Sequence, residues 1–320
     1  MPKPTSGQVH IDKPLTNISV AYMQSSSEFI ADKVFPVVPV QKKSDKYFKY
    51  SKEDWFRSDA KMRAPGTQSA GGGYELTTDD YVCDRYSIHK DVDDDTRANA
   101  DAPINVDREA TEYVTRQLML KKEKIWVSDY FTTGIWTGST TGTDIVPSTL
   151  WSAVGSDPVG DVDAQRDAMK QTTSYEPNVM VVSRSVHTIL KNHATILERI
   201  KYTQKGIVSE DLLATLFGVD KYLVASATEN TATEGKDADM NFMFGKDVLL
   251  AYAAKSPSIM QPSAGYTFGW NGLLGSGATG SRIKRFRMED IESDRVEGDL
   301  AFDLKVVGAD LGVFFNGAIA

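Results

Sequence analysis

The sequence predicts an α+β protein in which an extended N-terminal part precedes one long helix, a compact α/β block and closing strands. Three observations lead to this prediction. The first ninety residues are rich in aromatic residues and interrupted by proline and glycine, without a helical repeat. An apolar repeat of helical period runs through residues 105–131. From about residue 145, helical and strand patterns alternate, which is typical of a unit with its own core.

The composition excludes several classes of protein. Hydrophobic residues make up 41% and charged residues 25% of the 320-residue chain, as in soluble globular proteins. The formal net charge of −8 argues against a nucleic-acid sleeve or a protein that binds anionic membranes. The longest apolar run, 248–254, is too short to span a membrane, and the N-terminus lacks the apolar core of a signal peptide. The single cysteine, Cys83, excludes an internal disulfide framework and fits a reducing cytosol.

Residues 1–45 are expected to form an extended arm. Prolines disfavour a helix near its start: Pro2, Pro4 and Pro14. Residues 22–31 are a candidate short helix. The segment 34–40 carries two further prolines, which predicts an edge strand or an extended segment rather than a central strand.

Residues 46–90 are expected to form a long hairpin with strands at 46–56 and 81–90. The segment between the strands contains Ala64-Pro65-Gly66 and three consecutive glycines at 71–73, which are typical of turns and flexible tips. Eleven of the 65 residues from 22 to 86 are aromatic, against 10% in the whole chain. A two-stranded hairpin has no core of its own, so this apolar surface needs cover. A neighbouring subunit is the favoured source of cover, and folding back onto the same domain is the alternative. The candidates for contact with a neighbour are Phe35, Tyr47, Phe48, Tyr50, Trp55, Phe56, Lys61, Arg63 and Tyr74.

The clearest helix is predicted at about 105–131. Asn105 is the candidate N-cap, and Asp107 and Glu109 in the first turn suit the helix dipole. Its apolar face comprises Val106, Ala110, Tyr113, Val114, Leu118 and Ile125. About 25 residues span roughly 37 Å, so this helix is predicted to be a structural rod.

The block 145–255 is predicted to alternate helices and strands. Helices are expected at 161–173, at 184–192 and between Ser209 and Gly218, with strands at 179–182 and 219–226. Strands at 282–288 and 300–307 follow, separated by a turn at 295–298, and 313–315 closes the chain. Basic residues on the first of these strands are expected to make salt bridges between subunits, with phosphate contacts as the alternative: Arg282, Lys284, Arg285 and Arg287.

No motif in the sequence predicts a catalytic residue, a cofactor or a metal. The G-x-G-x-x-G run at 275–280 precedes an extended charged segment rather than a helix, so it fails as a dinucleotide fingerprint. The acidic run 91–95 starts like a calcium loop, but Thr96 and Ala102 replace the required Gly and Glu. A solvated acidic loop is the expectation there. The four histidines are scattered, and Cys83 is expected to be a small buried hydrophobe.

The order of these elements resembles the major capsid proteins of tailed bacteriophages, which have the HK97-like fold. The resemblance covers nearly the whole chain and depends on an ordered set of short phrases rather than on one signature. These are 29–36 (FIADKVFP), 47–50 (YFKY), 103–107 (PINVD), 177–183 (PNVMVVS), 213–219 (LATLFGV), 222–226 (YLVAS) and 308–315 (GADLGVFF).

The resemblance implies a domain organisation. Residues 1–45 would be the N-terminal arm, and 46–90 the extended hairpin loop that reaches over a neighbouring subunit. Residues 91–144 would form a peripheral domain with the spine helix at about 105–131. The axial α/β domain would be 145–255, and the strands of 256–320 would return to the peripheral domain.

The resemblance also implies a function without enzymatic activity. The chain would be a virion protein, assembled in the host cytoplasm, that forms pentamers and hexamers of an icosahedral shell around double-stranded DNA. Its partners would be other copies of itself, a separate scaffolding protein, a portal and a decoration protein, with non-specific contact to DNA and none to a membrane. The alternatives are an encapsulin-like compartment subunit and, from another class, a nucleotide-binding α/β enzyme that uses 275–280.

Overall fold

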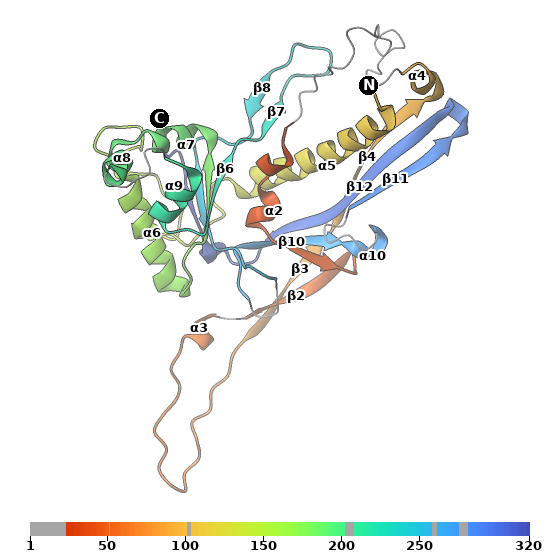
Figure 1. Ribbon diagram of the computed structural model, residues 1–320. Helices are drawn as coiled ribbons and strands as arrows, with labels where there is room; N and C mark the ends of the chain where they lie inside the picture. Colours follow the sequence, from red (N-terminus) through yellow and green to blue (C-terminus); the bar gives the residue numbers. More distant parts are fainter. Residues whose placement is uncertain (1–23, 51, 101–103, 202–207, 258–260, 275–280) are drawn as a thin grey trace.

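The computed structural model describes residues 24–50, 52–100, 104–201, 208–257, 261–274 and 281–320. Figure 1 shows an elongated body with two lobes, each built around one sheet, and a long loop that projects from the body. The first lobe combines a five-stranded sheet with one long helix, and the second combines a four-stranded sheet with shorter helices. The predicted α+β architecture is therefore confirmed.

The five-stranded sheet supports the long helix α5 (Val106–Tyr130), which lies along it. In chain order its strands are β1 (Val37–Val40), β4 (Asp84–Asp93), β10 (Gly265–Trp270), β11 (Ser281–Met288) and β12 (Ser293–Val306). The long strand β12 is antiparallel to β4, β10 and β11, so it joins segments that are distant in the sequence. Strand β1 pairs with β10 in parallel, and it lies at the edge of the sheet, as the prolines at 36 and 39 predict.

Helix α5 has close to the predicted bounds. The Asn105 side chain accepts a hydrogen bond of 3.0 Å from the backbone N–H of Arg108, which makes Asn105 the N-cap. Three residues of the predicted apolar face are buried against the sheet: Ala110, Val114 and Leu118. Tyr113, predicted for the same face, is 42% exposed because its ring lies beside the sheet, 5.6 Å from the Lys90 ammonium.

The four-stranded sheet confirms the predicted alternation of helices and strands. Its strands are β5 (Val179–Ser183), β6 (Lys221–Ala225), β9 (Val248–Ala251) and β13 (Gly312–Phe315). The surrounding helices are α6 (Pro158–Thr173), α7 (Arg184–Lys191), α8 (Ala194–Ile200) and α9 (Glu210–Phe217). Every residue of β5, β9 and β13 is buried, so this lobe has its own core. Gly218 ends α9 in the left-handed conformation (φ +63°), which suits a residue without Cβ.

The remaining elements are short. They are η2 (Ser26–Glu28), α2 (Ala31–Val34), β2 (Ser44–Tyr50), α3 (Lys52–Trp55), β3 (Leu76–Val82), α4 (Asp94–Ala98), β7 (Thr228–Asn230), β8 (Met240–Phe242), α10 (Asn271–Leu274), η3 (Glu289–Ile291) and η4 (Ala309–Leu311). The helix predicted at 22–31 is replaced, within the described residues, by η2 and α2.

The hairpin pairs different residues from those that the sequence predicts. Strand β2 pairs with β3, whereas β4 belongs to the five-stranded sheet. The alternating segment 81–90 is therefore the end of one strand and the start of another, with a break at Cys83. Cys83 is completely buried there, which confirms the expectation of a small buried hydrophobe, and its thiol donates to the carbonyl oxygen of Phe268 at 3.4 Å.

Two predictions near the C-terminus are wrong. Residues 295–298 are not a turn but the middle of β12, and the chain reverses at η3. The charged residues of this segment are typical of a turn when only the local sequence is considered. In the folded sheet, Arg295 instead pairs with Asp91 on the neighbouring strand. The closing strand β13 joins β9 in the four-stranded sheet, apart from the other C-terminal strands, because its apolar side chains fill that core.

The acidic run 91–95 is also not a solvated loop. It ends β4 and starts α4, and two of its carboxylates pair with arginines, while Asp93 caps α4. Asp91 pairs with Arg295 at 2.7 Å, and Asp94 pairs with Arg287 at 2.6 Å. Because these arginines come from β11 and β12, only the folded sheet brings the opposite charges together.

Gly298 permits the close approach of α5 to β12. A Cβ at this position would lie 2.3 Å from Val114 Cγ1 and 3.0 Å from Leu118 Cδ1. We therefore expect Gly298→Ala to lower the free energy of unfolding by about 1–3 kcal/mol, because the helix must move away from the strand. Denaturant unfolding measures this change.

Gly73→Ala is the matched control, because nothing lies within 4 Å of its Cβ position. We expect it to change the free energy of unfolding by no more than about 0.5 kcal/mol. Equal effects of the two substitutions would contradict the close helix–strand contact.

Candidate assembly interface

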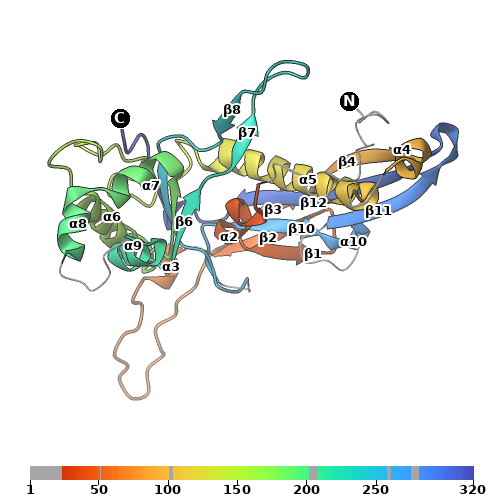
Figure 2. The same ribbon diagram turned by 45° about the horizontal axis from the view of Figure 1, so that its top comes forward.

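The segment between β2 and β3 projects from the body and is tied to it at its start by the ion pair of Lys52 with Asp310. Residues 52–75 form a loop that points away from the body in both views (Figures 1 and 2). All of them except Asp54 are exposed. Each side of the loop has about a dozen residues, so the tip can extend up to about 40 Å from the body. This length is sufficient to lie across a neighbouring subunit.

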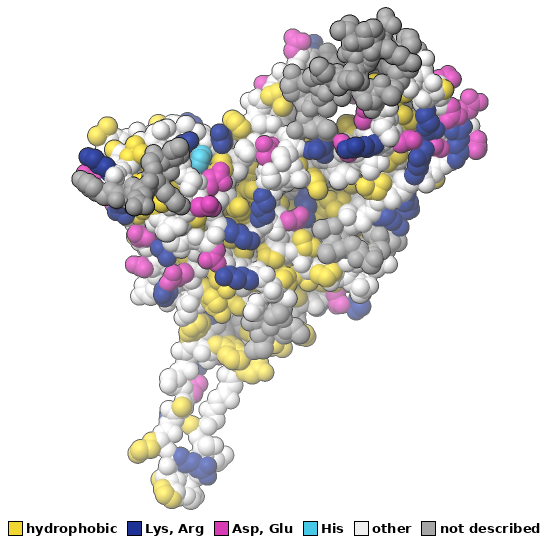
Figure 3. Space-filling model, viewed as in Figure 1, with side chains coloured by type: hydrophobic (Ala, Val, Ile, Leu, Met, Phe, Trp, Pro, Cys, Tyr) yellow, Lys and Arg dark blue, Asp and Glu magenta, His cyan; other side chains and the backbone are white. Residues whose placement is uncertain are grey.

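Large apolar side chains are exposed on this loop and on its stem. They include Phe48, Trp55, Phe56, Met62, Tyr74 and Leu76. Figure 3 shows hydrophobic and basic side chains together at the far end of the loop. Such apolar side chains, separated from the core, favour burial against another molecule. Phe48, Trp55, Phe56 and Tyr74 thus lie where a neighbour could contact them, and that contact remains a prediction.

The stem of the loop is held together by aromatic contacts. The rings of Tyr50, Trp55 and Tyr74 lie 5.6–6.3 Å apart, centroid to centroid. Beside them, the backbone N–H of Glu75 donates to the Asp54 carboxylate at 2.8 Å. The two sides of the loop are therefore joined where they leave the sheet.

Tyr47 makes contacts within its own chain. Its ring lies 5.5 Å from that of Phe268, and its hydroxyl donates to Asp79 Oδ2 at 3.0 Å. Burial and the Asp79 carboxylate raise the pKa of Tyr47. Only the part of Tyr47 that remains exposed is available to a neighbour.

The predicted basic candidates Lys61 and Arg63 are exposed near the tip of the loop, on either side of Met62. The Arg63 guanidinium donates to the backbone carbonyl of Thr67. Residues 57–63 contain three basic residues and one acidic residue, a formal net charge of +2. The tip is thus both apolar and positively charged.

Phe35 is not an intermolecular contact, which corrects the prediction. It is completely buried, with its ring centroid 6.0 Å from that of Trp126, 5.1 Å from Tyr130 and 6.3 Å from Trp136. Gly265 leaves space for the ring, because a Cβ there would lie 2.5 Å from it. Phe35 instead anchors the start of the chain to its own core.

Glu123 is a second anchor, which the sequence analysis missed. This fully buried carboxylate accepts backbone hydrogen bonds from Ile30 and Ala31 at 3.0–3.1 Å. Its neighbour Lys122 is also buried and pairs with Asp32. The spacing of residues in the sequence could have indicated this. Lys122 lies four residues after Leu118 and four before Trp126, so it belongs to the same buried face of α5.

The basic residues of β11 pair mainly within the chain. Arg282 pairs with Asp299 at 3.0 Å, Arg285 with Asp294 at 2.7 Å and Arg287 with Asp94 at 2.6 Å. These three arginines therefore have partners on adjacent elements of their own chain, and salt bridges from them to a neighbouring subunit stay a prediction. Lys284 is exposed and makes no ion pair within the described part of the chain, so it remains a candidate.

Asp299 is the centre of this charged sheet face. It is completely buried and accepts hydrogen bonds from Arg85 at 2.6 Å, Ser87 at 2.6 Å and Arg282 at 3.0 Å. Burial by itself would raise the pKa of Asp299, but the hydrogen bonds from Ser87, Arg85 and Arg282 outweigh it and lower the pKa. Around Asp299 the sheet face opposite α5 is thus stabilised by ion pairs, whereas toward β10 the same face is covered by an apolar cluster that includes Tyr81, Tyr266 and Phe268.

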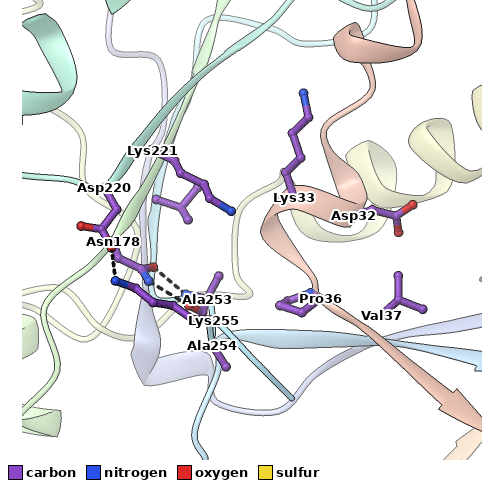
Figure 4. A pocket seen from close by; sticks show the side chains of 11 residues that line it. Asp32, Lys33, Pro36, Val37, Asn178, Asp220, Lys221, Ala253, Ala254 and Lys255 are labelled. Atoms are coloured by element: carbon purple, nitrogen blue, oxygen red, sulfur yellow. Dashed lines mark hydrogen bonds and ion pairs between the residues drawn. The ribbon is translucent and has the colours of Figure 1, made fainter. Parts of the chain in front are cut away.

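A cavity of about 270 Å³ lies between the two lobes (Figure 4). It is lined from the first lobe by the segment around α2 and β1, and from the second by β5, β6 and the residues after β9. Asn178 closes its floor by bonding to both the N–H and the carbonyl of Ala253 at 2.8 Å, and Lys255 pairs with Asp220 at 3.0 Å. Both interactions lie within the second lobe, and the arrangement of these groups does not form an acid–base or nucleophile–base pair.

Ser156 and His193 resemble a nucleophile–base pair by distance, 2.9 Å from Oγ to Nε2. The directions of the hydrogen bonds exclude that role. His193 Nδ1 accepts from the Thr195 backbone N–H as the N-cap of α8, so Nε2 carries the proton and donates to Ser156. The buried Ser156 hydroxyl lies 2.8 Å from the carbonyl of Ala153, to which it donates. The pair fixes two loops of the second lobe.

Three further observations concern a metal site, a membrane-spanning helix and the glycine-rich motif. Within the described residues, no group of three His, Cys, Asp or Glu side chains is arranged to hold a metal ion. No described helix is both long and apolar enough to cross a membrane. The G-x-G-x-x-G run at 275–280 lies outside the described residues.

The Glu123 anchor predicts a pH dependence. Burial raises the pKa of Glu123 from 4.5 to about 7, against the backbone donors, which lower it. Folding therefore takes up a proton between these pH values. The contribution of Glu123 to stability is complete below about pH 4.5 and is lost, by about 3 kcal/mol, as the pH rises through 7.

Glu123→Gln should remove this dependence because the amide does not titrate. We expect the difference in unfolding free energy between the unmodified chain and the variant to change by about 3 kcal/mol from pH 4.5 to 7.5, as measured by urea unfolding. The control is Glu289→Gln, whose side chain is 83% exposed, and its difference should stay constant. Parallel pH curves for Glu123→Gln and the unmodified chain would show that the prediction is wrong.

The chain is similar to phage proteins along its whole length. No protein-family model matches it. A protein of Burkholderia phage BcepMu named major capsid protein is 27% identical over 314 residues, 96% of each chain. Another of that name from Pseudomonas phage JBD67 is 26% identical over 321 residues, 97% of each chain.

Solved structures share the architecture. A phage-related protein from Bordetella bronchiseptica RB50 has a TM-score of 0.70 at 24% identity, with 93% of both chains covered. The capsid of cyanophage P-SCSP1u has a TM-score of 0.59 at 12% identity, covering 94% of this chain and 91% of that one. An encapsulin complex from Synechococcus elongatus PCC 7942 has a TM-score of 0.53 at 11% identity, covering 95% and 93%. The shared architecture and the whole-length sequence similarity make this chain a relative of the tailed-phage major capsid proteins with the HK97-like fold.

Proposed function

We propose that the chain is a major capsid protein, which assembles with copies of itself into an icosahedral shell around the double-stranded DNA of a tailed phage. One observation carries this proposal: a chain with a capsid fold extends a loop that exposes large apolar side chains far from its own core. The whole-length relatives named major capsid protein support it.

The two lobes and the projecting loop both suit assembly into a shell. The two lobes have buried cores and ion-paired surfaces, so they act as rigid bodies. The loop 52–75 has few contacts with these lobes and can adjust its direction. The same subunit can therefore occupy pentamers and hexamers, with the loop absorbing the difference in angle. Many repeated contacts of modest area then add up to a closed shell.

The charge of the subunit fits non-specific contact with DNA. The formal net charge of −8 is opposite to that of proteins that bind DNA tightly through its phosphates. A wall of such subunits would hold the genome without fixing it in place. A separate scaffolding protein, a portal and a decoration protein belong to the same proposal, since identical subunits do not by themselves set the size of a shell or admit DNA. The proposal also includes the domain roles given above, namely the arm, the hairpin loop, the peripheral domain and the axial domain.

An encapsulin-like compartment is the second candidate, because an encapsulin subunit shares the fold. The curated whole-length relatives favour the phage capsid. The content of the particles distinguishes the two: DNA and a portal at one vertex for a phage head, an enzyme cargo for a compartment. A nucleotide-binding enzyme would instead be a monomer that nucleotide stabilises against heat.

Electron microscopy of the expressed chain tests the proposal, and closed polyhedral particles tens of nanometres wide are expected. A variant with residues 56–73 replaced by a short Gly-Ser turn should keep the thermal stability of the lobes, because the deleted segment has few contacts with them. It should form fewer particles by at least tenfold. The control Val154→Ser changes an exposed apolar residue elsewhere and should assemble normally. An unmodified chain that stays monomeric would overturn the proposal.

A further inference from the structure

The second lobe carries a projection of its own, the hairpin of β7 and β8 (residues 228–242). In Figures 1 and 2 it points away from the body at the end opposite to the loop 52–75. We propose that the tip of the loop, residues 56–63, docks on the β7–β8 hairpin of a neighbouring copy. This inference rests on the proposed function as a shell subunit and names the surface that receives the loop.

The β7–β8 hairpin exposes apolar side chains that the described part of its own chain does not cover. Met240 is 59% exposed and Phe242 is 54% exposed. They lie two residues apart on β8, so they share one face of the hairpin. Within the described residues, β7 and β8 form a separate two-stranded sheet, with no third strand beside them. A Met–Phe surface on such a hairpin favours burial against another apolar surface.

The two projections have opposite charge. Residues 231–239, between β7 and β8, contain three acidic residues and one basic residue, a formal net charge of −2. Residues 57–63 of the loop tip carry +2. Each projection also exposes a methionine: Met62 on the tip and Met240 on the hairpin. Complementary charge around matched apolar side chains favours a second copy of this chain as the partner.

The hairpin is held in place at its base, so its outer face is presented in a fixed direction. Lys124 of α5 pairs with Glu229 of β7 at 2.5 Å. The side chain of Gln24 accepts from the backbone N–H of Thr228 at 3.1 Å and donates to its carbonyl at 2.5 Å. These bonds involve the base, and Met240 and Phe242 remain exposed.

The positions of the two surfaces determine the symmetry of the contact. Because the loop points away from the hairpin of its own chain, one subunit cannot join its own two surfaces (Figure 1). In a ring of copies, the loop of each copy would lie on the hairpin of the next, which is a heterologous contact. Heterologous contacts close into rings when the rotation between copies permits it, as the pentamers and hexamers of a shell require.

Disulfide trapping in assembled particles tests the contact directly. We expect the double variant Met62→Cys with Met240→Cys, oxidised after assembly, to give a ladder of covalently linked multimers on a non-reducing gel. Met62→Cys with Val154→Cys is the matched control, since Val154 is even more exposed than Met240 but lies outside the hairpin. The native Cys83 can stay, because it is buried and burial raises its pKa to about 12.

A charge exchange supplies a second measurement. Lys61→Glu with Arg63→Glu should reduce the yield of particles by at least tenfold, and adding Glu234→Lys with Asp237→Lys should restore most of it. Particles that form without cross-linking through Met62→Cys and Met240→Cys, or a yield that the exchange does not restore, would overturn this inference and leave the proposed function intact. An unmodified chain that forms no particles would overturn both.

Discussion

The close packing of α5 on β12 is the contact on which the rest of the molecule depends. It requires a glycine, because at Gly298 the helix side chains occupy the place of a Cβ. Strand β12 in turn pairs with β4, β10 and β11, which come from three distant parts of the chain. Helix α5 holds the arm through Glu123 and the β7–β8 hairpin through Lys124. The start of the described chain and the β7–β8 hairpin are thus tied to one helix–strand pair.

The opposite face of the same sheet is stabilised differently. At Asp299 the buried carboxylate accepts hydrogen bonds from two arginines and a serine on adjacent strands. Charged side chains that pair inside the chain are less available for ion pairs with another molecule. The rigid lobes therefore contribute shape, and the projections contribute the apolar and unbalanced charged surfaces that favour association.

Local sequence patterns predicted the elements that depend on local physics. The long helix was predictable from its apolar period and from Asn105, and α9 from Ser209 and Gly218, because caps and periodicity act within a few residues. The pairing of β13 with β9 and the continuity of β12 through residues 295–298 depend on distant partners, so the same reasoning could not find them.

The candidate interface shows the same limit. An excess of aromatic residues correctly indicated apolar surface on the loop, yet Phe35 and Phe48 look alike in sequence. Only in the folded chain is Phe35 packed against Trp126 and Trp136, whereas Phe48 is exposed to solvent. Glu123 was missed because a buried carboxylate can be recognised only once the backbone N–H groups that it binds are in place.

The exposed loop has a consequence for the life of the subunit before assembly. Its residues lack the buried backbone hydrogen bonds that protect a sheet, and it contains glycines and basic residues, so proteases can reach and cut it in a free chain. A subunit whose loop lies on a neighbour would be shielded. Folded subunits without a neighbour are therefore the ones that proteases degrade most readily. Assembly into a particle would thus protect a subunit from degradation.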